Sequence, residues 1–236
     1  MMSPAESEPT PGSGKRQGLA EEVASYVREQ IMSANFRPGE FLRTEPIAEA
    51  VGVSITPVRE GLLSLGAEGF VTLVPRRGFV VAAFTRQDVR DLFWTQGQLA
   101  GELAARAAAL ITSADIDVLQ ELAEDTQVAI AHGDTVRIGQ LGHQFHRTIN
   151  IAAHSSRLAR LLAGVVKHLP NHFYASIEAH VDSAPRQHQQ LVEALRIRDS
   201  DQARQIASAH LVDNSDYVVS MLEQRGLWAK SAATAS

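Results

Sequence analysis

The spacing of apolar positions in the first third of the chain predicts three short helices. From Leu19 the apolar residues recur every three or four positions, until Arg37-Pro38-Gly39 ends the first helix and makes a turn. A second helix is expected over 45–51, and a third is expected to open at Thr56-Pro57 and to close near Gly69. Thr56 suits the N-cap and Pro57 the first helical position, where proline loses only an N–H that has no partner in the helix.

A β-hairpin is predicted after these helices, and only helices are predicted after the hairpin. The β-branched and aromatic runs 70–74 and 79–81 flank Pro75-Arg76-Arg77-Gly78, a turn sequence. Beyond about Thr85 no strand is indicated, and residues suited to helix starts separate six expected helices: 86–110, 113–132, 134–153, 156–178, 184–198 and 200–225.

The expected fold is therefore mainly α. An N-terminal winged helix-turn-helix, made of three helices and a β-hairpin wing, precedes an all-α antiparallel helical bundle. The expected boundaries are a flexible tail at 1–17, the winged helix-turn-helix at 18–84, the bundle at 85–225 and a second flexible tail at 226–236.

Composition narrows the possible chemistry. The chain has 236 residues, 44% of them hydrophobic, a formal net charge of −5 and no cysteine. The lack of cysteine excludes disulfides, thiolate metal sites and cysteine nucleophiles. No apolar run approaches the ~18–20 residues that span a bilayer, and the polar N-terminus lacks the apolar core of a signal peptide. A cytoplasmic protein with no membrane partner is expected.

The helix-turn-helix pattern indicates contact with double-stranded DNA, although similar patterns also arise by chance in helical proteins. In such a domain the third helix enters the major groove, and the wing reaches a neighbouring groove. Residues 15–84 carry eight Lys/Arg and eight Asp/Glu, so a basic surface depends on arrangement and not on net charge. Hydroxyl and guanidinium groups suit phosphate and guanine contacts, and the candidate DNA-binding residues are Arg43, Ser54, Thr56, Arg59, Arg76, Arg77 and Gly78.

A family resemblance covers residues 19–82. The strings Pro38-Gly39-Glu40-Phe41-Leu42, 47–62 with its Thr56-Pro57-Val58-Arg59-Glu60 segment, and 75–81 resemble the DNA-binding domain of GntR-type transcription regulators. The resemblance implies that Thr56 and Arg59 contact DNA from the recognition helix, and that Arg77 and Gly78 enter the minor groove.

Two positions depart from that family pattern. Ile55 and Glu45 stand where the family commonly has DNA-contacting arginines. We therefore expect weaker attraction to phosphates or an atypical operator, with Arg43 as the compensating positive charge.

The histidines suggest a second site. All nine lie between His132 and His210, and helical projection turns His146, His188 and His210 toward apolar stripes, whereas His143 projects toward solvent. Buried imidazoles need partners. The sequence leaves two interpretations open: a divalent metal held by three imidazoles, or hydrogen-bonded core histidines.

The second part also resembles a known family. Phe145-His146-Arg147, the segment 188–195 and His210-Leu211 resemble the FCD effector-binding domain of the FadR-like GntR branch, in its six-helix, VanR-like group. The resemblance implies that His146, His188 and His210 bind a metal, but Gly142 stands where the family has an acidic ligand. Without that carboxylate, Zn or Ni is favoured over Mg or Mn, and Gly142→Asp is expected to raise metal affinity.

The effector side of the expected site rests on four residues. By the same resemblance, Gln96 and Ala100 replace an arginine and a glutamate of the family's first bundle helix, so a carboxylate would meet only a neutral hydrogen-bond donor there. Candidate effector-binding residues are Gln96, His172, Asn214 and Tyr217, and His168 is a further pocket candidate. The alternative, which the sequence favours for both His168 and His172, is a position at the rim near Pro170.

The expected function is metabolite-responsive regulation of transcription. We expect a cytoplasmic homodimer that binds an inverted-repeat operator, most simply as a repressor released by a small carboxylate effector. Two alternatives stay open: a constitutive DNA-binding protein whose bundle senses nothing, and a metal-dependent enzyme, against which no general base is evident.

Overall fold

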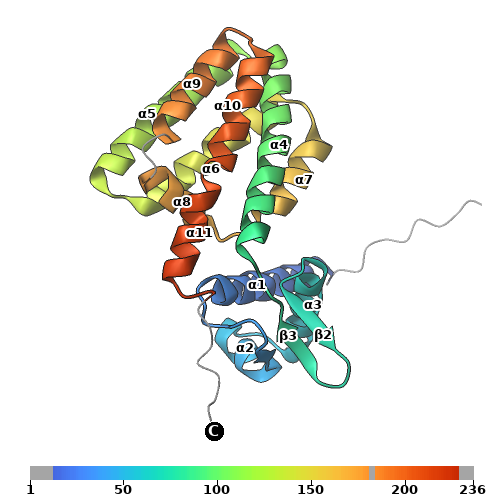
Figure 1. Cartoon of the computed structure of the whole chain (residues 1–236). Helices are drawn as coiled ribbons and strands as arrows, with labels where there is room; N and C mark the ends of the chain where they lie inside the picture. The colour runs from blue at the N-terminus through green and yellow to red at the C-terminus, as the bar shows by residue number, and fades with distance from the viewer. Residues whose placement is uncertain (1–12, 181–183, 229–236) are drawn as a thin grey trace, which may run out of the picture. The chain divides into compact units, whose positions relative to one another are not determined.

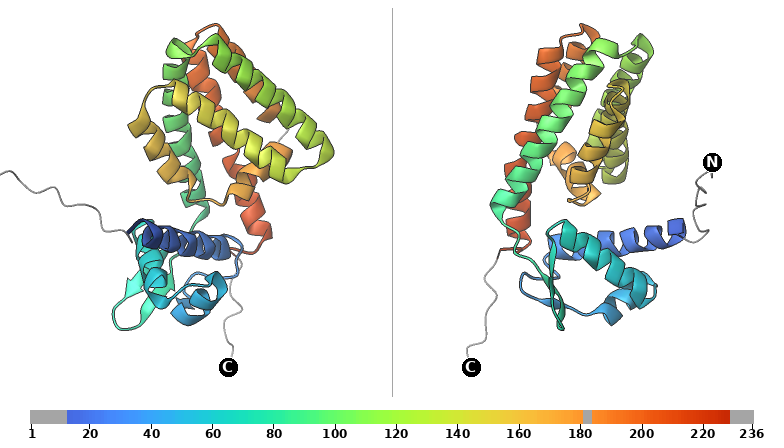
Figure 2. Two further views of the ribbon diagram at one scale, coloured as in Figure 1. Left: turned by 180° about the vertical axis from the view of Figure 1, so that it is seen from behind. Right: turned by 90° about the vertical axis from the view of Figure 1, so that its right-hand side faces the viewer.

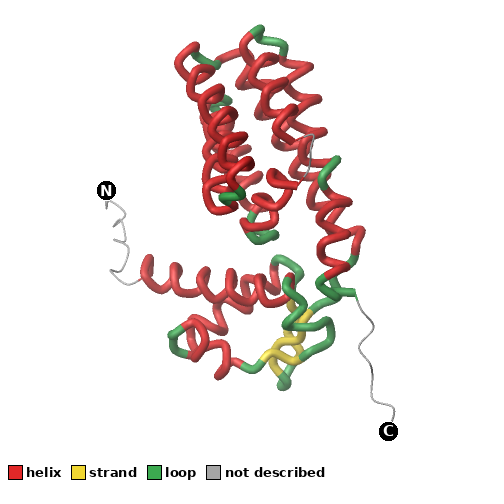
Figure 3. The backbone as a smooth tube through the Cα atoms, turned by 90° about the vertical axis from the view of Figure 1, so that its left-hand side faces the viewer, coloured by secondary structure: helices red, strands yellow, loops and turns green. Residues whose placement is uncertain are grey.

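The computed structural model describes residues 13–180 and 184–228. The chain divides into two compact units, one ending at Phe84 and the other beginning at Thr85. Strands occur in the N-terminal unit, and the described part of the second unit is built from helices (Figure 3). The mainly helical fold expected from the sequence, with a winged helix-turn-helix before a helical bundle, is confirmed.

The N-terminal unit packs three helices against a small sheet. Its elements are α1 (Ser13–Met32), β1 (Phe41–Leu42), α2 (Thr44–Val51), α3 (Ile55–Ala67), β2 (Val71–Val74) and β3 (Gly78–Val81). Val23 and Val27, one turn apart on α1, are fully buried, as are Val58, Leu62 and Leu65 on α3, which packs on α1. The apolar spacing that predicted the helices therefore also forms the core of this unit.

The wing differs from a simple hairpin. The sheet is three-stranded, antiparallel and ordered β1-β3-β2, because Phe41 and Leu42 pair with Val80 and Phe79. A two-residue strand has too short a pattern to be distinguished from a turn, and it was not predicted.

The helix starts in this unit also need correction. α1 begins at Ser13, so residues 13–17 are helical and not a flexible tail. The N-cap of α3 is Ser54, with an extended backbone at φ −78° and ψ 169°, and not Thr56. Pro57 therefore stands at the third helical position, where its missing N–H still costs nothing, because the first N–H groups of a helix have no partner inside it.

The second unit is a bundle of eight helices in the described residues: α4 (Arg86–Leu110), α5 (Ser113–His132), α6 (Thr135–Ala152), α7 (Ser156–Val166), α8 (Asn171–His180), α9 (Ala184–Arg196), α10 (Ser200–Val212) and α11 (Ser215–Gln224). α4 and α10 run side by side along the bundle (Figure 1), and α5, α6 and α7 lie behind them as a second layer (Figure 2, right). Phe93, Phe145 and Phe173 are among the largest fully buried side chains.

Two of the six expected bundle helices are each divided in two. The expected helix 156–178 breaks after Val166, since Pro170 lacks an N–H for a continuous ladder and starts a new direction. The expected helix 200–225 breaks at Asn214, whose side-chain amide donates to the carbonyl oxygen of His210 and so occupies a backbone acceptor.

α4 and α10 approach each other through two glycines. A Cβ atom on Gly97 would lie 2.8 Å from Val212 Cγ2, and one on Gly101 would lie 2.9 Å from the carbonyl oxygen of Arg204. The glycines are one turn apart and share one face of α4. Any side chain at either position would push the two helices apart.

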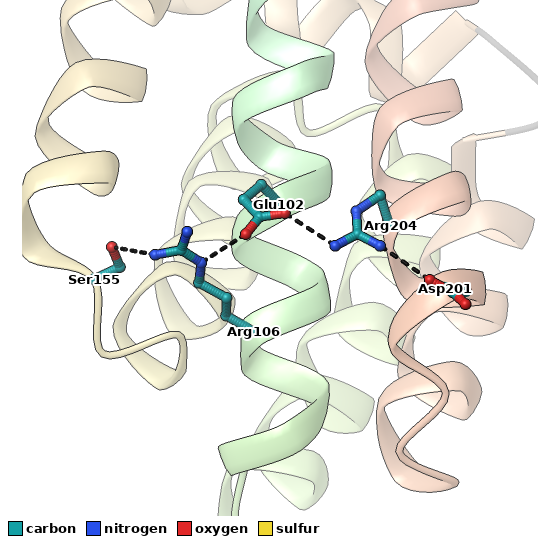
Figure 4. Close-up of polar contacts among 5 residues, drawn as sticks. All are labelled: Glu102, Arg106, Ser155, Asp201 and Arg204. Atoms are coloured by element: carbon teal, nitrogen blue, oxygen red, sulfur yellow. Dashed lines mark hydrogen bonds and ion pairs between the residues drawn. The ribbon is translucent and has the colours of Figure 1, made fainter.

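Ion pairs join the same two helices at the surface (Figure 4). Glu102 of α4 accepts from Arg106 Nε at 2.8 Å and from Arg204 Nη2 of α10 at 2.9 Å. Arg204 also pairs with Asp201, and Arg106 donates to Ser155, which precedes α7. Hydrogen bonds from the two arginines hold the pKa of Glu102 below its ordinary value.

Candidate metal centre and nucleic-acid interface

Four side chains from four helices converge inside the bundle. His146 of α6, Glu178 of α8, His188 of α9 and His210 of α10 each offer a ligand atom, and these atoms lie within 4.8 Å of one another. Glu178 Oε1 is 3.4 Å from Nε2 of both His188 and His210. In a tetrahedral site with metal–ligand bonds of about 2.1 Å, two ligand atoms lie about 3.4 Å apart.

The cluster is closely packed and mostly buried. His188, His210 and Glu178 are 1%, 3% and 6% exposed, and His146 is intermediate. The His188 ring stacks on Phe145 with centroids 4.2 Å apart, and its centroid is 4.8 Å from that of His210. Packing thus helps to fix the ring orientations.

Hydrogen bonding leaves lone pairs free to bind a cation. Gln187 Oε1, an amide oxygen, accepts from His210 Nδ1 at 3.1 Å, so Nε2 of that ring keeps its lone pair. Both ring nitrogens of His188 and Oε2 of Glu178 are buried without a hydrogen-bond partner in the described residues. Such atoms are costly to bury, and a divalent cation would satisfy them. The donor set therefore fits a metal ion.

The surroundings of the cluster also favour the charge states that a metal requires. Burial lowers the pKa of His146 to about 3, helped by the nearby rings of His210 and His188, and it lowers the pKa of His188 to about 4. Burial alone would raise the pKa of Glu178, but His188, His210 and His146 outweigh it and hold the pKa below its ordinary value. Neutral imidazoles and an ionised carboxylate are the forms that bind metals.

Glu178 is the residue that sequence reasoning missed. The expectation of a cluster without a carboxylate is corrected, because α8 supplies one to the three predicted histidines. The break at Pro170 hid it, since the phase of one continuous helix does not carry over to α8. Projection of 171–180 alone places Glu178 on one face with Tyr174, four residues earlier, and with the buried Ala175, three residues earlier, and this signal could have found it.

A second polar pair lies between α8 and α4. The hydroxyl of Tyr174, one turn before Glu178, is 3.1 Å from Gln96 Oε1 and 3.1 Å from the carbonyl oxygen of Val166. Gln96 is fully buried, and its Nε2 has no hydrogen-bond partner in the described part of the chain. Burial raises the pKa of Tyr174, which stays protonated. A buried amide N–H₂ is thus available to an acceptor.

The other sequence candidates of the bundle are dispersed. Asn214 is buried, but its side-chain amide already donates to the backbone carbonyl oxygen of His210. Tyr217 stacks on His180, with ring centroids 6.3 Å apart. His172 is exposed and contacts Arg225 at 3.2 Å. His143 is exposed, as the sequence predicted, and His168 is half-buried. The structure brings together the three predicted ligands but does not join His172 or Tyr217 to them.

The candidate DNA-binding side chains lie on the surface of the N-terminal unit. Those of Arg43, Ser54, Thr56, Arg59, Arg76 and Arg77 are all exposed. At the wing, Arg76 has φ +63° and Gly78 φ +98°, so the turn uses left-handed backbone on both sides of Arg77. The Arg77 guanidinium lies 4.4 Å from the centroid of the Phe41 ring. β1 therefore supports the wing arginine.

Comparisons with known proteins agree with both units. The model described as "Bacterial regulatory proteins, gntR family" matches residues 19–81, and the FCD domain model matches residues 91–213. The uncharacterized HTH-type transcriptional regulator YdhC of Bacillus subtilis is 25% identical over 206 residues, covering 85% of this chain and 91% of that protein. The HTH-type transcriptional repressor RspR of Escherichia coli is 23% identical over 215 residues, covering 90% and 94%.

A solved structure shares the fold. That of E. coli McbR/YncC superimposes with a TM-score of 0.64 at 24% identity and covers 88% of this chain and 98% of that one. In the residues that the structure describes, no helix is both long and apolar enough to cross a membrane.

Proposed function

Because this chain belongs to the FCD-domain regulators of the bacterial gntR family and is a transcriptional regulator, we propose that it controls its target genes by sensing a small organic acid in the bundle. The observation that carries the sensing proposal is the buried convergence of His146, Glu178, His188 and His210. A regulator that only bound DNA would have no use for four buried polar side chains whose burial costs free energy.

The DNA-reading surface of the proposal is α3 with the wing. Thr56 and Arg59 read the major groove, and Arg76, Arg77 and Gly78 reach the minor groove. The exposure of these side chains and the support of Arg77 by Phe41 favour this assignment. The operator is an inverted repeat read by a homodimer, because two-fold symmetry of protein and site go together.

The bundle cluster is proposed to hold Zn or Ni. Three imidazoles suit these borderline ions better than Mg or Mn. When bound, such an ion supplies a fixed positive charge that attracts a carboxylate oxygen. The buried amide of Gln96, with Tyr174 beside it, donates a hydrogen bond to a second acceptor of the same molecule. A small organic acid offers both.

Signalling needs a difference in affinity between two states. The acid shifts operator occupancy only if it binds one arrangement of the protein more tightly than the other. We propose that the protein represses transcription and that the acid relieves this repression. The relative RspR is named as a repressor.

Operator binding and acid sensing are tested together. Fluorescence anisotropy on promoter fragments from the chain's own genomic neighbourhood is measured at low salt, with and without Zn or Ni and a panel of mono- and dicarboxylic acids. Thermal unfolding is followed in the same solutions. We expect nanomolar binding to an inverted repeat, and one acid that weakens it while raising the melting temperature.

Two results contradict the proposal. Lack of binding to every fragment would reject the operator assignment. Tight operator binding that no acid changes, with or without either metal, would favour a constitutive DNA-binding protein.

A further inference from the structure

The carboxylate of the imidazole cluster comes from an unexpected helix. His146 lies on α6, and residue 142, one turn earlier on the same buried face, is glycine. A Cβ atom at Gly142 would lie 3.8 Å from Glu178 Cγ and 3.9 Å from Glu178 Oε1. The space beside an absent side chain on α6 is thus occupied by the Glu178 side chain from α8.

We propose that Glu178 replaces an acidic ligand on α6, and that the bound ion therefore controls how firmly α8 docks in the bundle. The proposal rests on the metal site of the proposed function. An acid at position 142 would add a ligand to a helix that already carries His146. An acid at position 178 connects a separate ten-residue helix to the ion.

The docking of α8 would depend on the ion because α8 carries a buried carboxylate. Phe173 and Ile177 are 0% and 3% exposed and anchor α8 in the bundle. Their burial also draws in the Glu178 carboxylate, whose Oε2 has no hydrogen-bond partner in the described residues. An anion buried with incomplete pairing opposes docking, and a cation between Glu178 and the imidazoles removes that opposition.

α8 also links the ion to Gln96. Tyr174 and Glu178 are four residues apart and lie on one face of the helix. A carboxylate fixed by the ion therefore keeps the Tyr174 hydroxyl within 3.1 Å of Gln96 Oε1. Ion occupancy and the position of Tyr174 beside Gln96 therefore change together.

Exchanging the two positions tests the proposal. Zn and Ni affinities are measured by chelator competition for wild type, Glu178→Gln, Gly142→Asp and Gly142→Asp/Glu178→Ala. Glu178→Gln should weaken binding by about 10-fold or more. Gly142→Asp alone should give no gain, because its carboxylate would lie against that of Glu178. The double variant should recover most of the lost metal affinity, since it moves the carboxylate ligand to α6.

Hydrogen–deuterium exchange tests the effect of the position of the carboxylate ligand separately from the affinity for the ion. In wild type, added ion should slow exchange in peptides covering 171–180, with peptides of α5 as the internal reference. In the double variant the ion should bind without slowing exchange in 171–180, because α8 no longer carries a ligand. Circular dichroism establishes that each variant is folded.

The outcomes distinguish this inference from the function on which it rests. If wild type binds neither Zn nor Ni, both the metal site and this proposal are wrong. If wild type binds the ion but Glu178→Gln binds it equally well, only the inference fails. It also fails if Gly142→Asp alone tightens binding tenfold, or if the ion slows exchange of α8 equally in the double variant.

Discussion

The two units of the chain carry their candidate sites in opposite ways. The DNA-binding candidates of the N-terminal unit lie within residues 43–78, and all of them except the half-buried Gly78 are exposed. The bundle site is buried and assembled from four helices, between residues 146 and 210. An exposed site is separable from the core that supports it, whereas in the bundle the same side chains serve as core and as site.

The largest expected effect tests the buried site. His188→Ala combined with His210→Ala removes two of four ligands, so Zn or Ni content should fall to the background of elemental analysis. The ion-dependent stabilisation, about 2.7 kcal/mol at 100 times the dissociation constant, should disappear with it. Exposed His143→Ala is the control and should retain the ion. Wild-type metal content in the double variant would place the ion elsewhere.

The next effect tests the exposed site. Arg59→Ala should weaken operator binding by about 100-fold while leaving the melting temperature unchanged, because the side chain is exposed and each specific base contact contributes about 1–3 kcal/mol. Arg137→Ala removes the same charge from the bundle surface, where it pairs with Asp125, and should bind the operator normally. Undiminished binding by Arg59→Ala would contradict the assignment of α3.

A smaller effect separates the contribution of the buried Gln96 to stability from its proposed contact with the acid. Gln96→Leu replaces an amide whose Nε2 has no partner in the described residues, and Tyr174 keeps the carbonyl oxygen of Val166 as acceptor. The free protein should be as stable as wild type or more stable by about 1 kcal/mol. The melting-temperature rise caused by the most effective acid of the panel should shrink severalfold. An undiminished rise would exclude Gln96 as a contact of the acid.

The smallest effect concerns the surface ion pairs. Glu102→Gln should cost about 1 kcal/mol or less at neutral pH, since the pairs with Arg106 and Arg204 are solvent-accessible. The folded pKa of Glu102 lies below 4.5, so its contribution is present above that pH and is lost as the pH falls through the folded pKa. The difference between variant and wild type in thermal unfolding should therefore close in acid. A constant difference would mean that charge is not its cause.

The same contrast explains what the sequence could predict. Arg59 and Arg77 follow from short strings, because each depends on its own helix or turn. The three histidines follow from helical projection, which places a side chain on the buried face of one continuous helix. Glu178 and Tyr174 do not, because both depend on the new helix phase after Pro170. Pro170 marks the break between α7 and α8, but the local sequence does not fix the direction in which α8 resumes. The two-residue strand β1 was missed because its pairing with β3 is not local.

The glycine contact between α4 and α10 has a mechanical consequence. At Gly97 and Gly101 no side chain of α4 stands between the two helices, so the backbone of α4 directly meets the side chains and backbone of α10. His210 sits on α10, and α4 starts at Arg86, directly after the chain leaves the N-terminal unit at Phe84. Because α4 and α10 are in such close contact, a shift of α10 at His210 would displace α4 as well.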